Sequence, residues 1–165
     1  AHIKMAGLNV VHEFGQALEA GKLFELHLNG QVPLRYDQDL AFGSDNPKEA
    51  LLLVDMLQQN DFDGIIAFDA HAYRVEDRDG VWDFVERNLR NYQLLSERAH
   101  VLRADPVVAE LLAEIAAGDE PIGKYSKASA DKLRAGRLAP DKIGLRRLPY
   151  ERLDQRLNEI LLGVV

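Results

Sequence analysis

The chain has 165 residues, and its 20 basic and 27 acidic side chains leave a formal net charge of −7. This length, with 47% hydrophobic and 28% charged residues, is typical of one globular domain. The acidic balance argues against a broad nucleic-acid or anionic-membrane surface, and the lack of cysteine excludes disulfides and thiolate metal sites. No apolar run approaches the roughly 20 residues that span a membrane. We expect a cytoplasmic protein that binds neither nucleic acid nor membranes.

The first half of the chain alternates between helical and strand patterns. Asn46 and Pro47 together are typical of a helix start, with Asn as the capping residue and Pro in the first helical position. The apolar run at 64–68 is typical of a strand in a parallel sheet that is covered on both faces. The expected elements are a helix from Leu8 to Gly21, a strand at 23–28, a loop at 29–45, a helix at 46–59 and a strand at 64–68.

The second half is expected to be mainly helical. An apolar stripe predicts the longest helix after Arg78, with Trp82 near its start placed in the core. A helix restarts at Pro106, and the segment from Gly118 to Pro149 is expected to be an extended tail because its periodicity is weak. A last amphipathic helix follows over Tyr150 to Leu162. The stripe comprises Val81, Val85, Asn88 or Leu89, Tyr92, Leu95, Ala99 and Leu102.

The element order gives two strand–helix units, which implies a parallel pair of strands. Two strands are too few, because a parallel pair exposes two edges and cannot cover its own hydrophobic faces. The missing strands must come from another polypeptide, from self-association or from a removed N-terminal part. The chain starts at Ala1 without an initiator Met, so we expect an excised or processed piece.

Several candidate metal ligands lie at or near strand ends. Asp37 and Asp39 are two residues apart in the loop after the first strand, so both carboxylates can face one cation, although paired loop acids are more often solvated turns. Such a set of oxygen and nitrogen donors favours Mg²⁺, Mn²⁺ or Co²⁺. The full set is His2, His27, Asp37, Asp39, Asp69 and possibly His71, whereas His12 and His100 fall within helices and are expected to be surface or packing residues.

These residues and their surroundings resemble a known family. The match is continuous over roughly the first 110 residues, resumes in the last helix and is absent from about Gly118 to Leu148. The chain closely resembles the C-terminal part of actinobacterial-type xylose isomerases, which are metal-dependent aldose–ketose isomerases. The matching strings include His2, Met5 to Asn9, Ala20 to Phe24, Leu28 to Gln31, Tyr36 to Leu40, Phe68-Asp69, Asp79 to Trp82, Arg103 to Pro106 and Glu151 to Gln155.

The resemblance implies an α/β fold, the C-terminal part of a (β/α)₈ TIM barrel. Residues 1–104 would hold the last two βα units as a partial barrel. Residues 105–165 would form a C-terminal helix and an extended helical arm for oligomerisation, in a homotetramer. A TIM barrel needs about 250 residues, so the N-terminal portion of the barrel is an expected partner. The expected substrate is a monosaccharide, with D-xylose converted to D-xylulose by a hydride shift and two divalent metal ions as cofactors.

The resemblance also implies individual roles. His2, Asp37 and Asp39 match ligands of the family's second metal ion, and Asp69 matches a ligand of the first. His27 stands where the family has an Asp ligand, which predicts a preference for Mn²⁺, Co²⁺ or Zn²⁺ over Mg²⁺. The other departures are Glu25 at a family His, Ile3 at a Glu, and His71 at a Lys near the second strand end; we assign His71 a catalytic role.

Other hypotheses remain open. His27 followed by an acid-x-acid loop is also similar to L-rhamnose isomerases, so another sugar isomerase is an alternative. The resemblance implies that further metal ligands and the ring-opening residues would precede Ala1. A catalytically incomplete assembly module is therefore the second alternative. A third alternative is another activity on the same kind of barrel, such as an epimerase or a metal-dependent endonuclease, of which the endonuclease is disfavoured by the charge of −7 and by the lack of a basic, aromatic groove.

Overall fold

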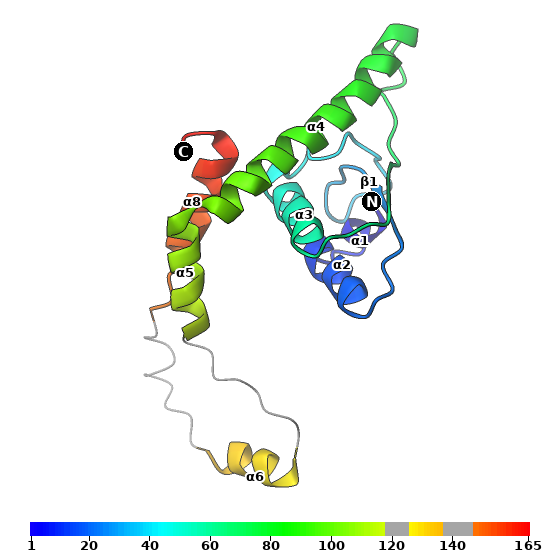
Figure 1. The fold of residues 1–165 in the computed structure, drawn as a ribbon. Helices are drawn as coiled ribbons and strands as arrows, with labels where there is room; N and C mark the ends of the chain where they lie inside the picture. The colour runs from blue at the N-terminus through cyan, green and yellow to red at the C-terminus, as the bar shows by residue number, and fades with distance from the viewer. Residues whose placement is uncertain (118–125, 137–146) are drawn as a thin grey trace. The chain divides into compact units, whose positions relative to one another are not determined.

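The computed structural model describes residues 1–117, 126–136 and 147–165, and it divides into two compact units (Figure 1). The first unit comprises Ala1–Ala104 together with Leu157–Val165, and the second comprises Asp105–Arg156. The assignment of a partial barrel and an oligomerisation arm to parts of the chain stays a prediction.

The first unit contains a parallel pair of strands, as expected. Strand β1 (Glu25–Leu28) pairs with β2 (Ile65–Phe68), and the described residues hold only these two strands. Side chains alternate across β1, so that Leu26 and Leu28 are buried and Glu25 and His27 are exposed. One face of β1 is therefore apolar and covered, and the other, its polar face, carries Glu25 and His27.

Four helices lie wholly in this unit, which also holds the end of α8 (Tyr150–Leu162): α1 (His2–Met5), α2 (Val10–Glu19), α3 (Pro47–Gln59) and α4 (Arg78–Ala104). The side chains of Asn9 and Asn46 cap α2 and α3 by accepting backbone N–H bonds, and Pro47 begins α3 as predicted. The one-turn helix α1 was not predicted. Figure 1 shows α3 between α4 on one side and α1 and α2 on the other, and α3 contacts both α2 and α4.

The core of the first unit lies between the sheet and α3. Leu51 and Val54 of α3 are fully buried and pack with Leu26 of β1. Three aromatic rings, those of Phe42, Phe68 and Tyr92, lie with centroids 6.3 Å apart in each pair. These contacts bury Leu26 and Leu28 and partly bury Phe68, and they leave Glu25 and His27 on the exposed face of β1.

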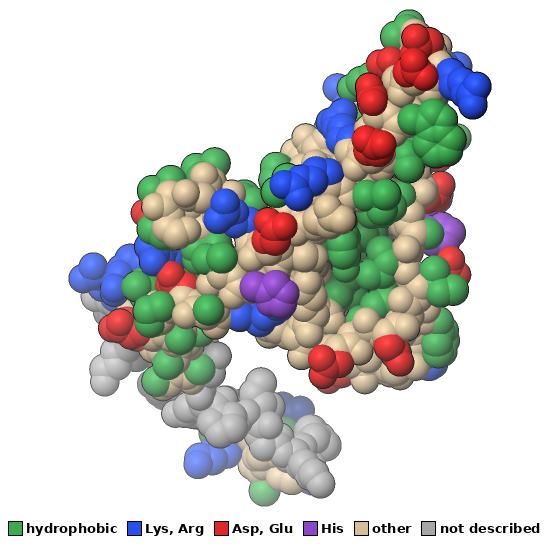
Figure 2. All heavy atoms as spheres, turned by 45° about the horizontal axis from the view of Figure 1, so that its top comes forward, with side chains coloured by type: hydrophobic (Ala, Val, Ile, Leu, Met, Phe, Trp, Pro, Cys, Tyr) green, Lys and Arg blue, Asp and Glu red, His purple; other side chains and the backbone are tan. Residues whose placement is uncertain are grey.

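Helix α4 confirms only part of its predicted apolar stripe. Its C-terminal half buries Leu95, Ala99 and Leu102, but Trp82 near its start is 59% exposed, so the core placement of Trp82 was wrong. Val81, Val85 and Leu89 are exposed too, because α4 extends beyond the elements that cover its other half. Figure 2 shows hydrophobic side chains in a hollow beside α4 and mixed charges toward its projecting end. Within the described ranges, no helix is long and apolar enough to cross a membrane.

The second unit contains α5 (Pro106–Ala117), α6 (Lys127–Ala135) and the first residues of α8 (Tyr150–Leu162). The prediction of an extended tail was wrong over α6, where Ser126 and Ser129 form a capping box that begins the helix. The rest of that prediction, at 118–125 and 137–146, lies outside the described residues. Asp105 accepts hydrogen bonds from Arg156 (2.6 Å) and from the backbone of Val108, so it joins α8 to the start of α5.

We predict that Leu51→Ala lowers the free energy of unfolding by about 2–5 kcal/mol, because Leu51 is completely buried and its removal leaves a cavity. Urea unfolding followed by circular dichroism measures this change. Leu162→Ala is the matched control, since Leu162 is 76% exposed and its truncation is expected to change stability by less than about 0.5 kcal/mol. Equal effects of the two substitutions would contradict the position of the core.

Candidate metal centre

The predicted site residues follow the carboxyl ends of the two strands. Because β1 and β2 are parallel and Leu28 pairs with Phe68, the loops that leave them begin at the same edge of the sheet. The loop after β1 folds back, since Gly30 and Leu40 exchange two backbone hydrogen bonds of 2.7 and 2.9 Å. A Cβ at Gly30 would lie 2.6 Å from the carbonyl oxygen of Ala41, so only glycine fits this close approach. The fold thereby returns Asp39 to the strand end.

The side chain of Asn29 holds three segments together at this edge. Its Nδ2 donates to Asp39 Oδ1 and to the backbone oxygen of Asp69, both at 2.9 Å, and its Oδ1 accepts from the Ala1 ammonium at 2.6 Å. The backbone N–H of His71 donates to the carbonyl oxygen of Asp39 at 3.1 Å, which adds a second link between the loops. Sequence reasoning did not assign a role to Asn29. An amide directly after a strand end was the available signal.

The acid-x-acid loop is an ordered structure and not a loose solvated turn. Gln31 is completely buried, and its amide nitrogen donates to the carbonyl oxygens of Val32 and Arg35. The oxygen of the same side chain accepts from the backbone N–H of Gln38, at 2.7 Å. Asp37 is exposed and Asp39 is half-buried. The loop thus encloses one amide side chain and presents its two carboxylates in a defined backbone conformation.

Negative charge from three predicted ligands converges on the start of the chain. Burial lowers the pKa of the Ala1 ammonium, and the carboxylates of Asp39, Asp37 and Asp69 oppose that shift. The structure therefore brings these acids into electrostatic reach of one point, next to His2. Their oxygen donors fit a hard divalent cation.

His27 lies between two carboxylates on the polar face. Its Nε2 is 2.8 Å from Glu25 Oε1, and its Nδ1 is 3.7 Å from Asp69 Oδ2. The hydrogen bond to Glu25 is the main cause that raises the pKa of His27 above 6.5, and the charge of Asp69 adds to it. The predicted ligands His27 and Asp69 are thus neighbours.

The predicted set is only partly assembled. Among the residues that the structure describes, no three His, Asp or Glu side chains are close enough together to hold a metal ion. His2 is exposed, and so is His71, whose Nδ1 lies 3.0 Å from the carbonyl oxygen of Ala72. His12 and His100 are exposed on helices, as expected, and contact Gln16 and Arg103. The donor types fit a divalent ion, and the roles of these residues as metal ligands stay predictions.

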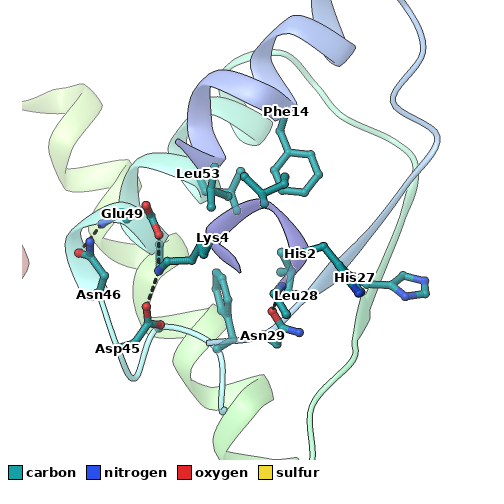
Figure 3. Close-up of a pocket in the computed structure, with 16 residues that line it drawn as sticks. His2, Lys4, Phe14, His27, Leu28, Asn29, Asp45, Asn46, Glu49 and Leu53 are labelled. Carbon is teal, nitrogen blue, oxygen red and sulfur yellow. Dashed lines mark hydrogen bonds and ion pairs between the residues drawn. The ribbon is translucent and has the colours of Figure 1, made fainter. Parts of the chain in front are cut away.

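A cavity of about 210 Å³ lies beside this edge and contains a buried ion cluster that sequence reasoning missed. Lys4 of α1 is 7% exposed and pairs with Asp45 and with Glu49, the latter at 2.6 Å. Burial lowers the pKa of Lys4, but the hydrogen bonds to both carboxylates outweigh it, so the pKa is raised. In Figure 3, Lys4 points toward Asp45 and Glu49, and His27 points away from them. The cluster fixes α1, and with it His2, to the start of α3.

Comparison with known proteins shows that the chain is similar in sequence to several xylose isomerases. The chain is 48% identical to the xylose isomerases of Thermus caldophilus and Thermus thermophilus and 41% identical to that of Streptomyces lividans. These alignments cover 98–99% of this chain, including the segment where we expected no match, but only 42–43% of each relative. The chain thus spans about two fifths of the length of these proteins. No family model matches it.

We predict that Asn29→Ala loosens the loop that carries Asp39, because it removes the hydrogen bond to that carboxylate. The loss of about 1–1.5 kcal/mol per hydrogen bond corresponds to roughly ten-fold faster amide exchange at His71, whose N–H is bonded to the Asp39 carbonyl. Hydrogen exchange followed by NMR measures this rate. Asn60→Ala removes a comparable amide bond, to Met56 at the end of α3, and is expected to leave His71 unchanged.

We predict a pH dependence at His27. Its ion pairs with Glu25 and Asp69 favour the charged imidazole, so their contribution to stability is fully present below pH 6.5 and is lost as the pH rises through the raised pKa. An NMR titration of the His27 ring is expected to give a midpoint above 6.5, and Glu25→Gln to move it down toward 6.5. The same midpoint in both proteins would show that Glu25 does not stabilise the imidazolium.

Proposed function

We propose that this chain is part of a metal-dependent aldose–ketose isomerase of the actinobacterial xylose isomerase type, which converts D-xylose to D-xylulose. The observation that carries the proposal is 48% identity over 99% of the chain to proteins named xylose isomerase. The gathering of Asp39, Asp37 and Asp69 at one edge supports it. Because the chain spans 43% of those relatives, the complete site would include residues outside these 165.

The chain's own donors would hold two divalent ions in part. His2, Asp37 and Asp39 would bind one ion, and Asp69 and His27 the other. Oxygen and nitrogen donors without sulfur suit Mg²⁺, Mn²⁺ and Co²⁺, and His27 in place of a carboxylate favours the softer ions. When bound, the ions act as Lewis acids that polarise the sugar carbonyl.

His71 is the proposed catalytic side chain of this part of the site. A carbonyl oxygen can only accept, so the Ala72 carbonyl beside Nδ1 requires that this nitrogen donates. The neutral ring would then present Nε2 as an acceptor toward a sugar hydroxyl. Asn29 would keep Asp39 in place without contacting the sugar.

The proposed partners complete the structure. Each strand has one edge that is unpaired within the described residues, which supports further barrel strands from the N-terminal portion of the barrel. A homotetramer through residues 105–165 and a cytoplasmic location complete the proposal.

A catalytically incomplete assembly module is the second candidate, and an L-rhamnose-type or other sugar isomerase is a variant of the first. The exposed apolar side chains of Val81, Trp82, Val85 and Leu89 favour an assembly role because they require a covering partner.

The test is a chimera in which this chain replaces the matched region of the Thermus thermophilus xylose isomerase. Isomerase activity with D-xylose and Mn²⁺ or Mg²⁺ would support the proposal. A folded, tetrameric chimera that converts no aldose would contradict it and favour the assembly module. Activity with L-rhamnose alone would favour the variant.

We predict that Asp37→Ala with Asp39→Ala lowers the kcat of the chimera by about 10³-fold or more. A Lewis-acid ion contributes several kcal/mol to catalysis, and each 1.4 kcal/mol is a factor of ten. Asp63→Ala, which removes an exposed acid away from the site, is the control and is expected to keep full activity. Unchanged turnover in the double variant would remove both residues from the metal site.

A further inference from the structure

Glu25 and His27 form a pair on the polar face of β1. Residues two apart on a strand project from the same face, and both side chains are about half exposed. Opposite His27 the register places Ala67, whose small side chain leaves room beside the imidazole. Asp69 lies two residues after Ala67, on the same side of the segment that continues β2, and its carboxylate is within reach of the His27 ring.

We propose that Glu25 is a positioning residue that fixes the tautomer of His27, so that Nδ1 is the atom that binds the divalent ion shared with Asp69. This inference rests on the proposed function, and it gives a role to a residue that stands at a histidine position in the similar family.

The chemistry of the two contacts dictates the arrangement. An ionised carboxylate is only an acceptor, so Glu25 Oε1 at 2.8 Å from Nε2 requires that Nε2 carries the hydrogen. In the neutral ring Nδ1 is then an acceptor, and it faces the carboxylate oxygen of Asp69.

In the protonated ring, Nδ1–H faces Asp69 as a donor; in the neutral ring the two facing acceptors repel unless a metal cation takes the place of that proton. Their separation of 3.7 Å is too long for a direct hydrogen bond. Two donor atoms bound to one ion at about 2.1 Å each can lie up to about 4.2 Å apart. The spacing of Nδ1 and Asp69 Oδ2 therefore suits a shared ion. A carboxylate on the other ring nitrogen is the usual partner that orients a metal-binding histidine.

The first measurement is the tautomer of His27 in the 165-residue chain, from ¹⁵N chemical shifts of the imidazole at a pH where the ring is neutral. We expect the Nε2–H form to predominate. Glu25→Gln is expected to raise the Nδ1–H population, because a glutamine amide can also donate to Nε2. Glu19→Gln, an exposed acid on α2, is the control. The positioning role would be overturned if Nδ1–H were the major tautomer in the unsubstituted chain, or if Glu25→Gln left the tautomer populations unchanged.

The second measurement uses Mn²⁺ alone and follows the paramagnetic broadening of His27 and Asp69 resonances. Glu25→Gln is expected to need 10–100-fold more Mn²⁺ for the same broadening, the usual effect of losing an orienting partner. Broadening that spares both residues would overturn the ligating role of Nδ1. Activity of the chimera is a separate readout, so an active chimera without the tautomer effect would remove this inference and leave the proposed function intact.

Discussion

The hydrogen bonds of one amide, Asn29, join the three segments that carry most of the candidate site. This side chain uses both of its ends, donating to the acid-x-acid loop and to the backbone after β2 and accepting from the start of the chain. Each of those segments is irregular, so regular secondary structure does not place them. Without the amide, the Asp39 carboxylate would lose a neutral hydrogen-bond donor, and the backbone after β2 would lose its link to that loop. The predicted ligands are thus gathered by a residue that is not itself a candidate ligand.

The two faces of β1 have different roles: one packs in the core, and the other carries candidate site residues. The side chains of Leu26 and Leu28 enter the core under α3, whereas Glu25 and His27 remain on the open face. A shift of the register by one residue would exchange these faces, so the buried leucines also fix where the imidazole lies. Lys4 and its two carboxylates, Asp45 and Glu49, line the cavity, and their ion pairs join α1 to the start of α3.

The sequence was sufficient for features that depend on local pattern. The two parallel strands, the capped start of α3 and the bounds of α8 follow from periodicity and from Asn46-Pro47, and they are confirmed. The misses have different causes. Trp82 fits the apolar stripe of α4, but it is exposed. Helical periodicity does not show how far along the helix other elements pack against it. The capping box at Ser126 begins α6 without an apolar stripe. Asn29 and Lys4 acquire their roles from partners in other segments, the most distant of them 40 and 41 residues away. The metal ligands themselves stay predictions.

Helix α8 is divided between the two units, and its last residues return to the beginning of the fold. Ile160 is completely buried, and Leu161 packs against a core built from residues 26–99. During synthesis the ribosome releases these residues after residues 1–156. Part of the core of the first unit therefore stays uncovered until α8 has been synthesised. The contact between α8 and this core is long-range, and such contacts slow folding. Until then a nascent chain displays the apolar surface that Ile160 and Leu161 later cover, so the docking of α8 removes one site of aggregation and chaperone binding.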